Sequence, residues 1–264
     1  MGIALLIVIW LITFASSYFF LAKTWWLPTG ASAAAAGIDH HFATTYLLMG
    51  IVFVAAQLSL GFFAWRFRER GSSPPARYVH GNNLLEIVWT VLTAILFIGL
   101  NLMSSSIWAS ERFRPAQPGA TQVEVTGMQF QWYFRYPGPD GKFGRTDLKL
   151  VNDSGGNPFG IDDKDPASKD DIVSASLKIP AGKPIKLIMH SRDVIHNFFV
   201  RELRMKQDIV PGMEIPMSFQ ADTIGTYEVP CSELCGLGHF QMRTTMQVMS
   251  PADFEKWKIE KAQK

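Results

Sequence analysis

Apolar residues gather in three long runs near the start of the chain, and a different pattern follows them. The first run, residues 3–22, carries no charge. A helix of about 20 residues is about 30 Å long, the thickness of a membrane's hydrocarbon core. Two more runs cover Thr45–Trp65 and Leu84–Trp108. We therefore expect membrane helices at residues 45–65 and 84–108, and a membrane helix or a signal peptide at residues 1–23.

Arginines mark the loop between the second and third runs, residues 66–83, as cytoplasmic. The stretches Arg66–Arg70 and Pro74–Arg77 together hold four arginines and one glutamate, and short basic loops stay on the cytoplasmic side. Everything after Trp108 then lies on the opposite side of the membrane. The basic region of a signal peptide is missing, whereas the small residues Ala31–Ala36 are compatible with cleavage. Both possibilities give the same external domain.

After Trp108 the chain changes to short runs of β-branched and aromatic residues separated by Gly and Pro. Many short strands with such turns are typical of a β-sandwich or barrel, which we expect over residues 116–264. Ser250 followed by Pro251 predicts the start of a C-terminal helix. The predicted strands are Thr121–Thr126, Phe130–Tyr136, Asp147–Val151, Ser174–Ile179, Ile185–His190, Ile195–Val200, Pro216–Phe219 and Thr226–Val229.

Both cysteines of the chain lie in segment 230–242 with a histidine and a methionine, and another histidine lies upstream. Thiolate, imidazole and thioether together select a soft or borderline metal, copper above all. Two thiolates can bridge two copper ions, and each ion then needs one imidazole and one weak axial donor. This inventory predicts a dinuclear copper site for electron transfer. The predicted ligands are His196, Cys231, the Glu233 carbonyl, Cys235, His239 and Met242.

Three simpler interpretations compete with copper. The cysteines could form a disulfide in an oxidising compartment, although this leaves the histidines and Met242 without a role. A structural zinc site of two Cys and two His usually takes its ligands as two tight pairs and has no use for a thioether. His196 and Met242 could also simply pack in a core.

The motif Cys-Ser-Glu-Leu-Cys-Gly-x-x-His-x-x-Met, preceded by Asp-Val-x-His, resembles subunit II of haem–copper cytochrome c oxidases. Leu85–Thr90 resembles the start of that family's second membrane helix, and Lys206–Gly212 its Asp-x-x-Pro-Gly turn. The resemblance covers roughly residues 45–258. It implies a membrane α-helical hairpin, with two or three helices here, followed by an all-β cupredoxin-like Greek-key sandwich.

The resemblance also implies a function. Electrons would come from cytochrome c or a membrane-bound c-type cytochrome and pass to haem in subunit I, where oxygen is reduced to water and protons are pumped. The haems would lie only in the partner, since the chain has no Cys-x-x-Cys-His motif. Subunits I and III would be partners in a bacterial inner membrane, with the copper domain on the periplasmic side. No basic run suggests nucleic acid, and the formal net charge is +2.

The resemblance also draws attention to five residues outside the copper ligand atoms. Phe130 stands where the family has the tryptophan that receives the electron, and Trp132 matches a second family aromatic; both are also candidates for plain core. Glu86 matches a glutamate at the entrance of a proton channel, or is an interfacial carboxylate at a helix N-terminus. The Glu233 carboxylate is implied as a magnesium ligand at the subunit interface. Arg135 stands where an acid is common.

Two other functions, and two roles for one segment, are compatible with parts of the sequence. A copper-delivery protein would bind a single cuprous ion, and a quinol oxidase subunit II would be a scaffold without copper. The membrane hairpin and the complete ligand set disfavour them. The acidic segment 152–171 is either a solvated loop or a patch that steers a basic cytochrome.

Overall fold

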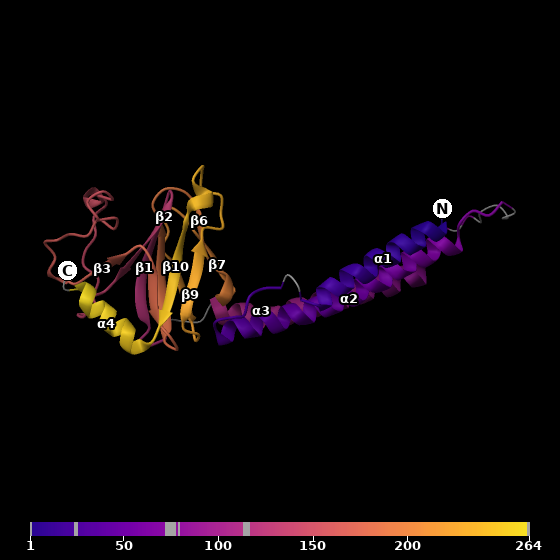
Figure 1. Ribbon diagram of the computed structural model, residues 1–264, viewed down its shortest axis with the longest axis horizontal. Helices are drawn as coiled ribbons and strands as arrows, with labels where there is room; N and C mark the ends of the chain where they lie inside the picture. Colours follow the sequence, from indigo (N-terminus) through magenta and orange to yellow (C-terminus); the bar gives the residue numbers. More distant parts are fainter. Residues whose placement is uncertain (1, 24–25, 72–77, 79, 113–116, 263–264) are drawn as a thin grey trace. The chain divides into compact units, whose positions relative to one another are not determined.

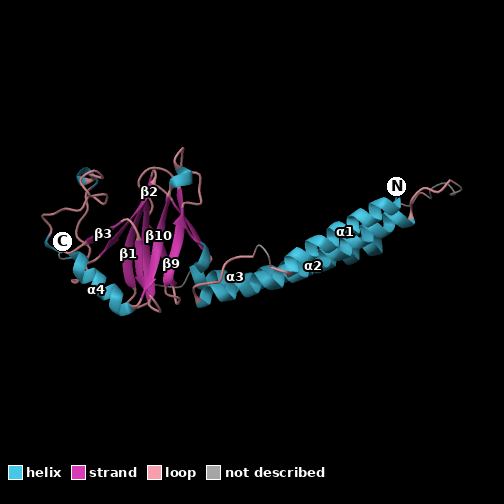
Figure 2. Cartoon of the chain, in the orientation of Figure 1, coloured by secondary structure: helices cyan, strands magenta, loops and turns pink. Residues whose placement is uncertain are grey.

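The computed structural model describes residues 2–23, 26–71, 78, 80–112 and 117–262. The chain divides into two compact units (Figure 1). One comprises Met1–Leu27 and Ile38–Ile107, and the other comprises Pro28–Gly37 and Trp108–Lys264. Figure 2 shows that long helices make up the first unit and strands most of the second.

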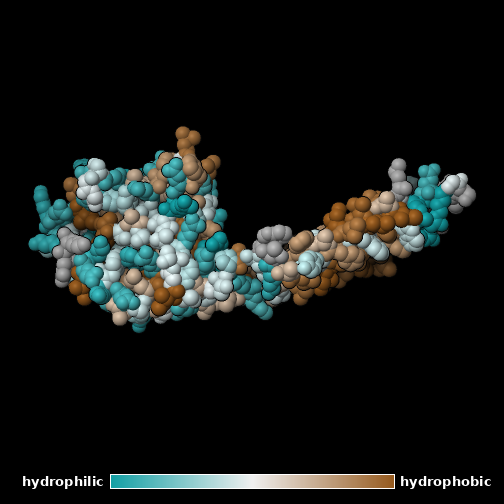
Figure 3. Space-filling model, viewed as in Figure 1, coloured by the Kyte–Doolittle hydropathy of each residue, from teal (hydrophilic) through white to brown (hydrophobic). Residues whose placement is uncertain are grey.

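The first unit consists of long apolar helices, which are α1 (Gly2–Leu21) and most of α2 (Ala33–Arg66) and of α3 (Asn83–Arg112). Each is long and apolar enough to cross a membrane. Hydrophobic side chains cover much of the visible surface of α1 and α2 (Figure 3). The Trp10 indole N–H donates to the Leu58 carbonyl at 3.3 Å, so α1 packs on α2. The Pro74–Arg77 part of the arginine-rich loop lies outside the described residues.

Helix α2 begins well before the predicted residue 45 because its first turn is held by the β unit. Ala31 N–H donates to the Glu202 carbonyl, and the Ala31 carbonyl accepts from Asp222 N–H, both at 2.8 Å. The Asp222 carboxylate accepts from Ala33 N–H at 2.9 Å, which satisfies a free donor at the helix N-terminus. The following alanines favour the helix. Ala31 and Ala35, in the stretch considered for cleavage, are buried.

The second unit is built from mixed β-sheets. A five-stranded sheet has the order β3-β2-β1-β5-β8, a three-stranded sheet has β4-β10-β9, and β6 pairs with β7. The pairs β1–β5 and β4–β10 are parallel, and the other pairs are antiparallel. The strands are β1 (Thr121–Met128), β2 (Gln131–Tyr136), β3 (Ile172–Ser174), β4 (Leu177–Pro180), β5 (Pro184–Ser191), β6 (His196–Val200), β7 (Met205–Ile209), β8 (Ile215–Gln220), β9 (Gly225–Pro230) and β10 (Arg243–Met249).

Alternating side chains from these sheets fill one core. In β5, every second residue is buried, and the same alternation places Val123 and Val125 of β1 in the core. Helix α4 (Pro251–Ala262) begins as predicted, with Ser250 Oγ accepting from Asp253 N–H at 3.1 Å. Its Trp257 packs edge-on against Tyr136, with ring centroids 5.0 Å apart. The result is a rigid sandwich that can hold ligands at one end.

The predicted strand Asp147–Val151 is wrong. Residues Leu148–Leu150 form a 3₁₀ turn, η1, in which the Asp147 carboxylate accepts from Lys149 N–H at 2.9 Å. A carboxylate that bonds its own backbone two residues on favours a turn over a strand. Leu148 is 84% exposed, so the apolar run here faces outward and belongs to the long β2–β3 connection.

Candidate metal centre

The donor-rich loop connects β9 to β10 at one end of the sandwich (Figure 1). Cys231 directly follows β9, and Met242 directly precedes β10. Cys231 N–H donates to the Met242 carbonyl at 2.9 Å, which closes the loop across its base. Ser232 N–H donates to the Asn197 carbonyl at 3.1 Å, and Phe198 forms an isolated bridge with Cys231. These bonds bring the loop against β6, which begins at His196.

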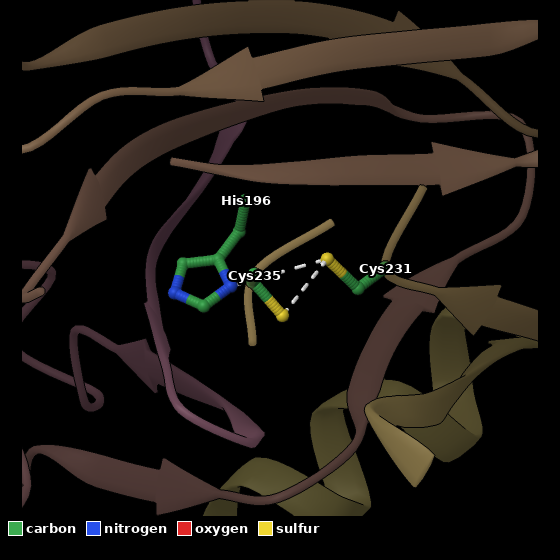
Figure 4. Close-up of side chains that lie close together, drawn as sticks. All are labelled: His196, Cys231 and Cys235. Atoms are coloured by element: carbon green, nitrogen blue, oxygen red, sulfur yellow. Dashed lines mark hydrogen bonds between the residues drawn. The ribbon is translucent and has the colours of Figure 1, made fainter. Parts of the chain in front are cut away.

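The predicted donors of segment 231–242 and His196 converge. The sulfurs of Cys231 and Cys235 are 3.9 Å apart, and the Cys231 sulfur lies 3.9 Å from His196 Nδ1 and 3.2 Å from the Glu233 carbonyl. Figure 4 shows the His196 ring and the two thiols close together; one ligand atom from each lies within 4.8 Å of the others. On the other side, the Cys235 sulfur lies 3.5 Å from His239 Nδ1 and 3.7 Å from Met242 Sδ.

Asp193 fixes the orientation of the His196 ring. Its Oδ1 lies 2.7 Å from His196 Nε2, which leaves Nδ1 to face the sulfurs. Oδ2 accepts from Gln129 N–H at 2.7 Å. Burial of Asp193 would raise the pKa of its carboxyl, but the hydrogen bonds outweigh burial and lower that pKa. A carboxylate behind a histidine fixes the tautomer that a metal ligand needs.

The surroundings shift the pKa values of the two thiols in opposite directions. Burial opposes ionisation of Cys231, but hydrogen bonds from the His196 ring and the Asn197 backbone lower the pKa of that thiol to about 6. Burial and the nearby Cys231 sulfur raise the pKa of Cys235 to about 12. Two thiolates side by side need nearby positive charge, and metal ions supply it because a coordinating thiol is deprotonated.

The geometry separates the competing interpretations of the donor set. A sulfur–sulfur distance of 3.9 Å is far longer than a disulfide bond of about 2.05 Å, and both cysteines are free. Met242 and His196 are buried, as core residues would be, but their donor atoms face the thiols. The thioether and the carbonyl would be surplus in a zinc site of two Cys and two His. The residues therefore fit soft metal ions, and copper best.

The two aromatic candidates occupy different surroundings. Trp132 is 2% exposed, and its ring packs edge-on against His196 and Phe198 with centroids 6.1 and 5.6 Å away. Phe130 is partly exposed and lies against the loop, where a Cβ on Gly238 would come within 2.4 Å of its ring. Trp132 therefore belongs to the wall behind His196, whereas Phe130 reaches the surface.

The two glutamates also lie in different surroundings. Glu233 is exposed, while its backbone carbonyl lies 3.2 Å from the Cys231 sulfur. Glu86 lies in the first turn of α3. A carboxylate at that position interacts favourably with the helix dipole.

The acidic segment 152–171 directs several of its carboxylates toward the protein itself. Asp171 forms ion pairs with the buried Arg135 at 2.5 Å, and Asp153 pairs with Arg192 at 2.7 Å. Arg145 contacts two further aspartates, Asp162 at 3.2 Å and Asp165 at 3.5 Å. These carboxylates fold the β2–β3 connection and are partly neutralised, which weakens the case for a steering patch.

Sequence reasoning missed two residues of the centre. Gln129 reaches the loop with its side chain, whose amide donates to the Cys235 carbonyl at 2.5 Å. Asn197 is 3% exposed, and its carbonyl holds Ser232. Neither side chain is a thiolate, an imidazole or a thioether, so neither enters an inventory of soft-metal ligands. For Asn197, the only signal was its place directly after His196.

Comparisons with known proteins identify the family. The family description "Cytochrome C oxidase subunit II, periplasmic domain" matches residues 123–249, and "Cytochrome C oxidase subunit II, transmembrane domain" matches residues 21–107. The "Alternative cytochrome c oxidase subunit 2" of Bradyrhizobium diazoefficiens is 35% identical over 259 residues, covering 97% of this chain and 91% of that protein. The chain belongs to the cytochrome c oxidase subunit II family.

A second relative and one solved structure are also similar to the chain. "Cytochrome c oxidase subunit 2" of Thermostichus vulcanus is 31% identical over 284 residues, covering 88% of this chain and 77% of that protein. The solved periplasmic domain of subunit II from Bradyrhizobium japonicum has 24% identity and a TM-score of 0.41, covering 56% of this chain and 98% of that domain. The predicted family is confirmed, and so is the predicted order of apolar helices followed by a β-sheet domain. The chain is a membrane subunit of a haem–copper oxidoreductase, with its β domain outside.

Proposed function

We propose that this subunit II is an electron relay that holds a dinuclear copper A centre. His196, Cys231, Glu233 O, Cys235, His239 and Met242 would be the copper ligands. When bound, such a pair of ions accepts and donates single electrons. The observation that carries the proposal is the convergence of six donors, two of them free thiols 3.9 Å apart.

The chain's own residues support rapid electron transfer by limiting movement. The loop is closed at its base by the Cys231–Met242 backbone bond, and His196 is held from behind by Asp193. Trp132 and Phe198 pack around the histidine. Because the ligands already have fixed orientations, little rearrangement is needed when the charge of the centre changes.

The partners follow from the family and from the surface of the loop. Electrons would arrive from a c-type cytochrome, with Phe130 as the more accessible of the two aromatic candidates. They would leave for haem in subunit I, in a complex with subunit III in a bacterial inner membrane. The exposed Glu233 carboxylate would hold magnesium at the interface, and Glu86 would mark a proton-channel entrance.

Copper quantification with electron paramagnetic resonance on the purified full-length chain tests the proposal. We expect two coppers per chain that share one unpaired electron. A single-copper signal would instead indicate copper delivery, and a copper-free, fully folded chain would indicate the quinol oxidase scaffold. Either result overturns the relay.

A further inference from the structure

The β1–β2 turn contacts both ligand-bearing segments of the centre. Its residue Gln129 follows the last residue of β1 and uses two different groups. The backbone N–H donates to Asp193 Oδ2 at 2.7 Å, and Asp193 holds the His196 ring. The side-chain amide donates to the Cys235 carbonyl at 2.5 Å. One residue thus joins the His196 support to the cysteine loop, two segments far apart in the sequence.

The carbonyl that Gln129 holds belongs to the bend of the loop. Gly236 follows Cys235 with φ of +130°, a conformation that glycine adopts readily and other residues rarely do. A Cβ on Gly236 would lie 2.7 Å from the Gln129 amide nitrogen, so the loop approaches the side chain as closely as a glycine permits. A fixed Cys235 carbonyl restricts rotation of the Cys235–Gly236 peptide, and with it the direction of the cysteine side chain.

The next residue reinforces this contact. The Phe130 ring lies over the same stretch, and a Cβ on Gly236 would meet it at 3.2 Å. The turn therefore supplies one directional bond from Gln129 and one apolar surface from Phe130. Cys231, by contrast, is fixed by its own backbone bond to Met242 and by its bridge with Phe198.

We infer that Gln129 is a positioning residue, which fixes the Cys235 thiol in the orientation that the second half of the centre requires. It acts through the Cys235 carbonyl and touches no predicted donor atom. Its loss should affect the two cysteines unequally, because only Cys235 depends on this bond. The consequence for copper rests on the proposed function, but the orientation of the thiol does not.

Gln129→Met tests the inference, because methionine keeps a similar length and lacks the amide donor. Gln122→Met is the matched control, since Gln122 is an exposed glutamine on the same β1 strand. Gln129→Glu is a second variant that places an acceptor against the carbonyl. In the reduced, metal-free, full-length chain, iodoacetamide labelling of each cysteine is followed by peptide mass spectrometry.

We expect both Gln129 variants to label Cys235 about fivefold faster than the control, the size of effect that one hydrogen bond supports. Cys231 should label at the control rate. In the copper-loaded chain, the paramagnetic resonance spectrum should show the electron shared unequally between the two ions. Equal Cys235 labelling in Gln129→Met and Gln122→Met overturns the inference, whatever the copper content. A wild-type chain without the two-copper signal would overturn the proposed function instead.

Discussion

Replacing Asp193 by asparagine should weaken copper binding without disturbing the fold. The carboxylate oxygens face three donors at 2.7 Å, namely His196 Nε2 and the backbone N–H groups of Gln129 and Val194. Asparagine has one acceptor oxygen, so its NH₂ group, which cannot accept a hydrogen bond, must face at least one of these donors. Loss of an outer carboxylate of this kind typically costs about 10- to 100-fold in metal affinity, or about 1.4–2.7 kcal/mol.

The assay compares copper loss to a chelator from the purified full-length chain with that from Asp222→Asn. Asp222 is a suitable control because its carboxylate also accepts from a backbone N–H, that of Ala33, but bonds none of the predicted donors. We expect faster copper loss in Asp193→Asn alone. The same variant should show altered hyperfine couplings of the histidine nitrogens in the paramagnetic resonance spectrum. Wild-type copper retention and unchanged couplings in that variant would refute the assigned role of Asp193.

Three further predictions concern the axial ligand and the β2–β3 connection. Met242→Leu should retain most of its copper while its redox potential and electron-transfer rate change, and unchanged spectra and turnover would remove Met242 from the ligands. Arg135→Met should make proteolysis of the connection at least about 10²-fold faster, because a broken buried pair leaves the Asp171 carboxylate without its guanidinium partner at a cost of about 3–5 kcal/mol. Wild-type proteolysis rates would contradict this. The pairing with Arg192 lowers the pKa of Asp153, so its stabilisation is full above pH 3.8 and is lost as pH falls below it. Hydrogen-exchange rates near residue 153 should therefore differ between wild type and Asp153→Asn at pH 6 and become equal well below pH 3.8. A difference that stays constant with pH would contradict the pairing.

Local patterns in the sequence were sufficient to select residues that converge in the fold and to place most strands. The ligand types and their spacing specify a soft-metal site without any coordinates, because few other arrangements use thiolates, imidazoles and a thioether together. Alternation of buried and exposed residues likewise places β1 and β5. Helix α4 follows from its capping residues.

Other elements depend on contacts that no local pattern contains. Strand β7, Met205–Ile209, is largely polar and becomes a strand through its pairing with β6. Strand β10 is an exception, because it does have a local pattern: Met246 and Val248 alternate with less buried residues, and its β-branched residues favour a strand. The turn at Leu148 depends on the Asp147 side chain, and the role of Gln129 on a loop more than 100 residues away.

The closed base of the cysteine loop makes residues 231–242 a self-contained insert. Pro230 and Arg243 are paired neighbours on β9 and β10, so the insert leaves and rejoins the framework at adjacent points. A sandwich with two such antiparallel strands could accept it by grafting, provided that the host supplies counterparts of His196, Asp193 and Gln129. Five of the six predicted donors would travel together, and the support around them sets which hosts are suitable.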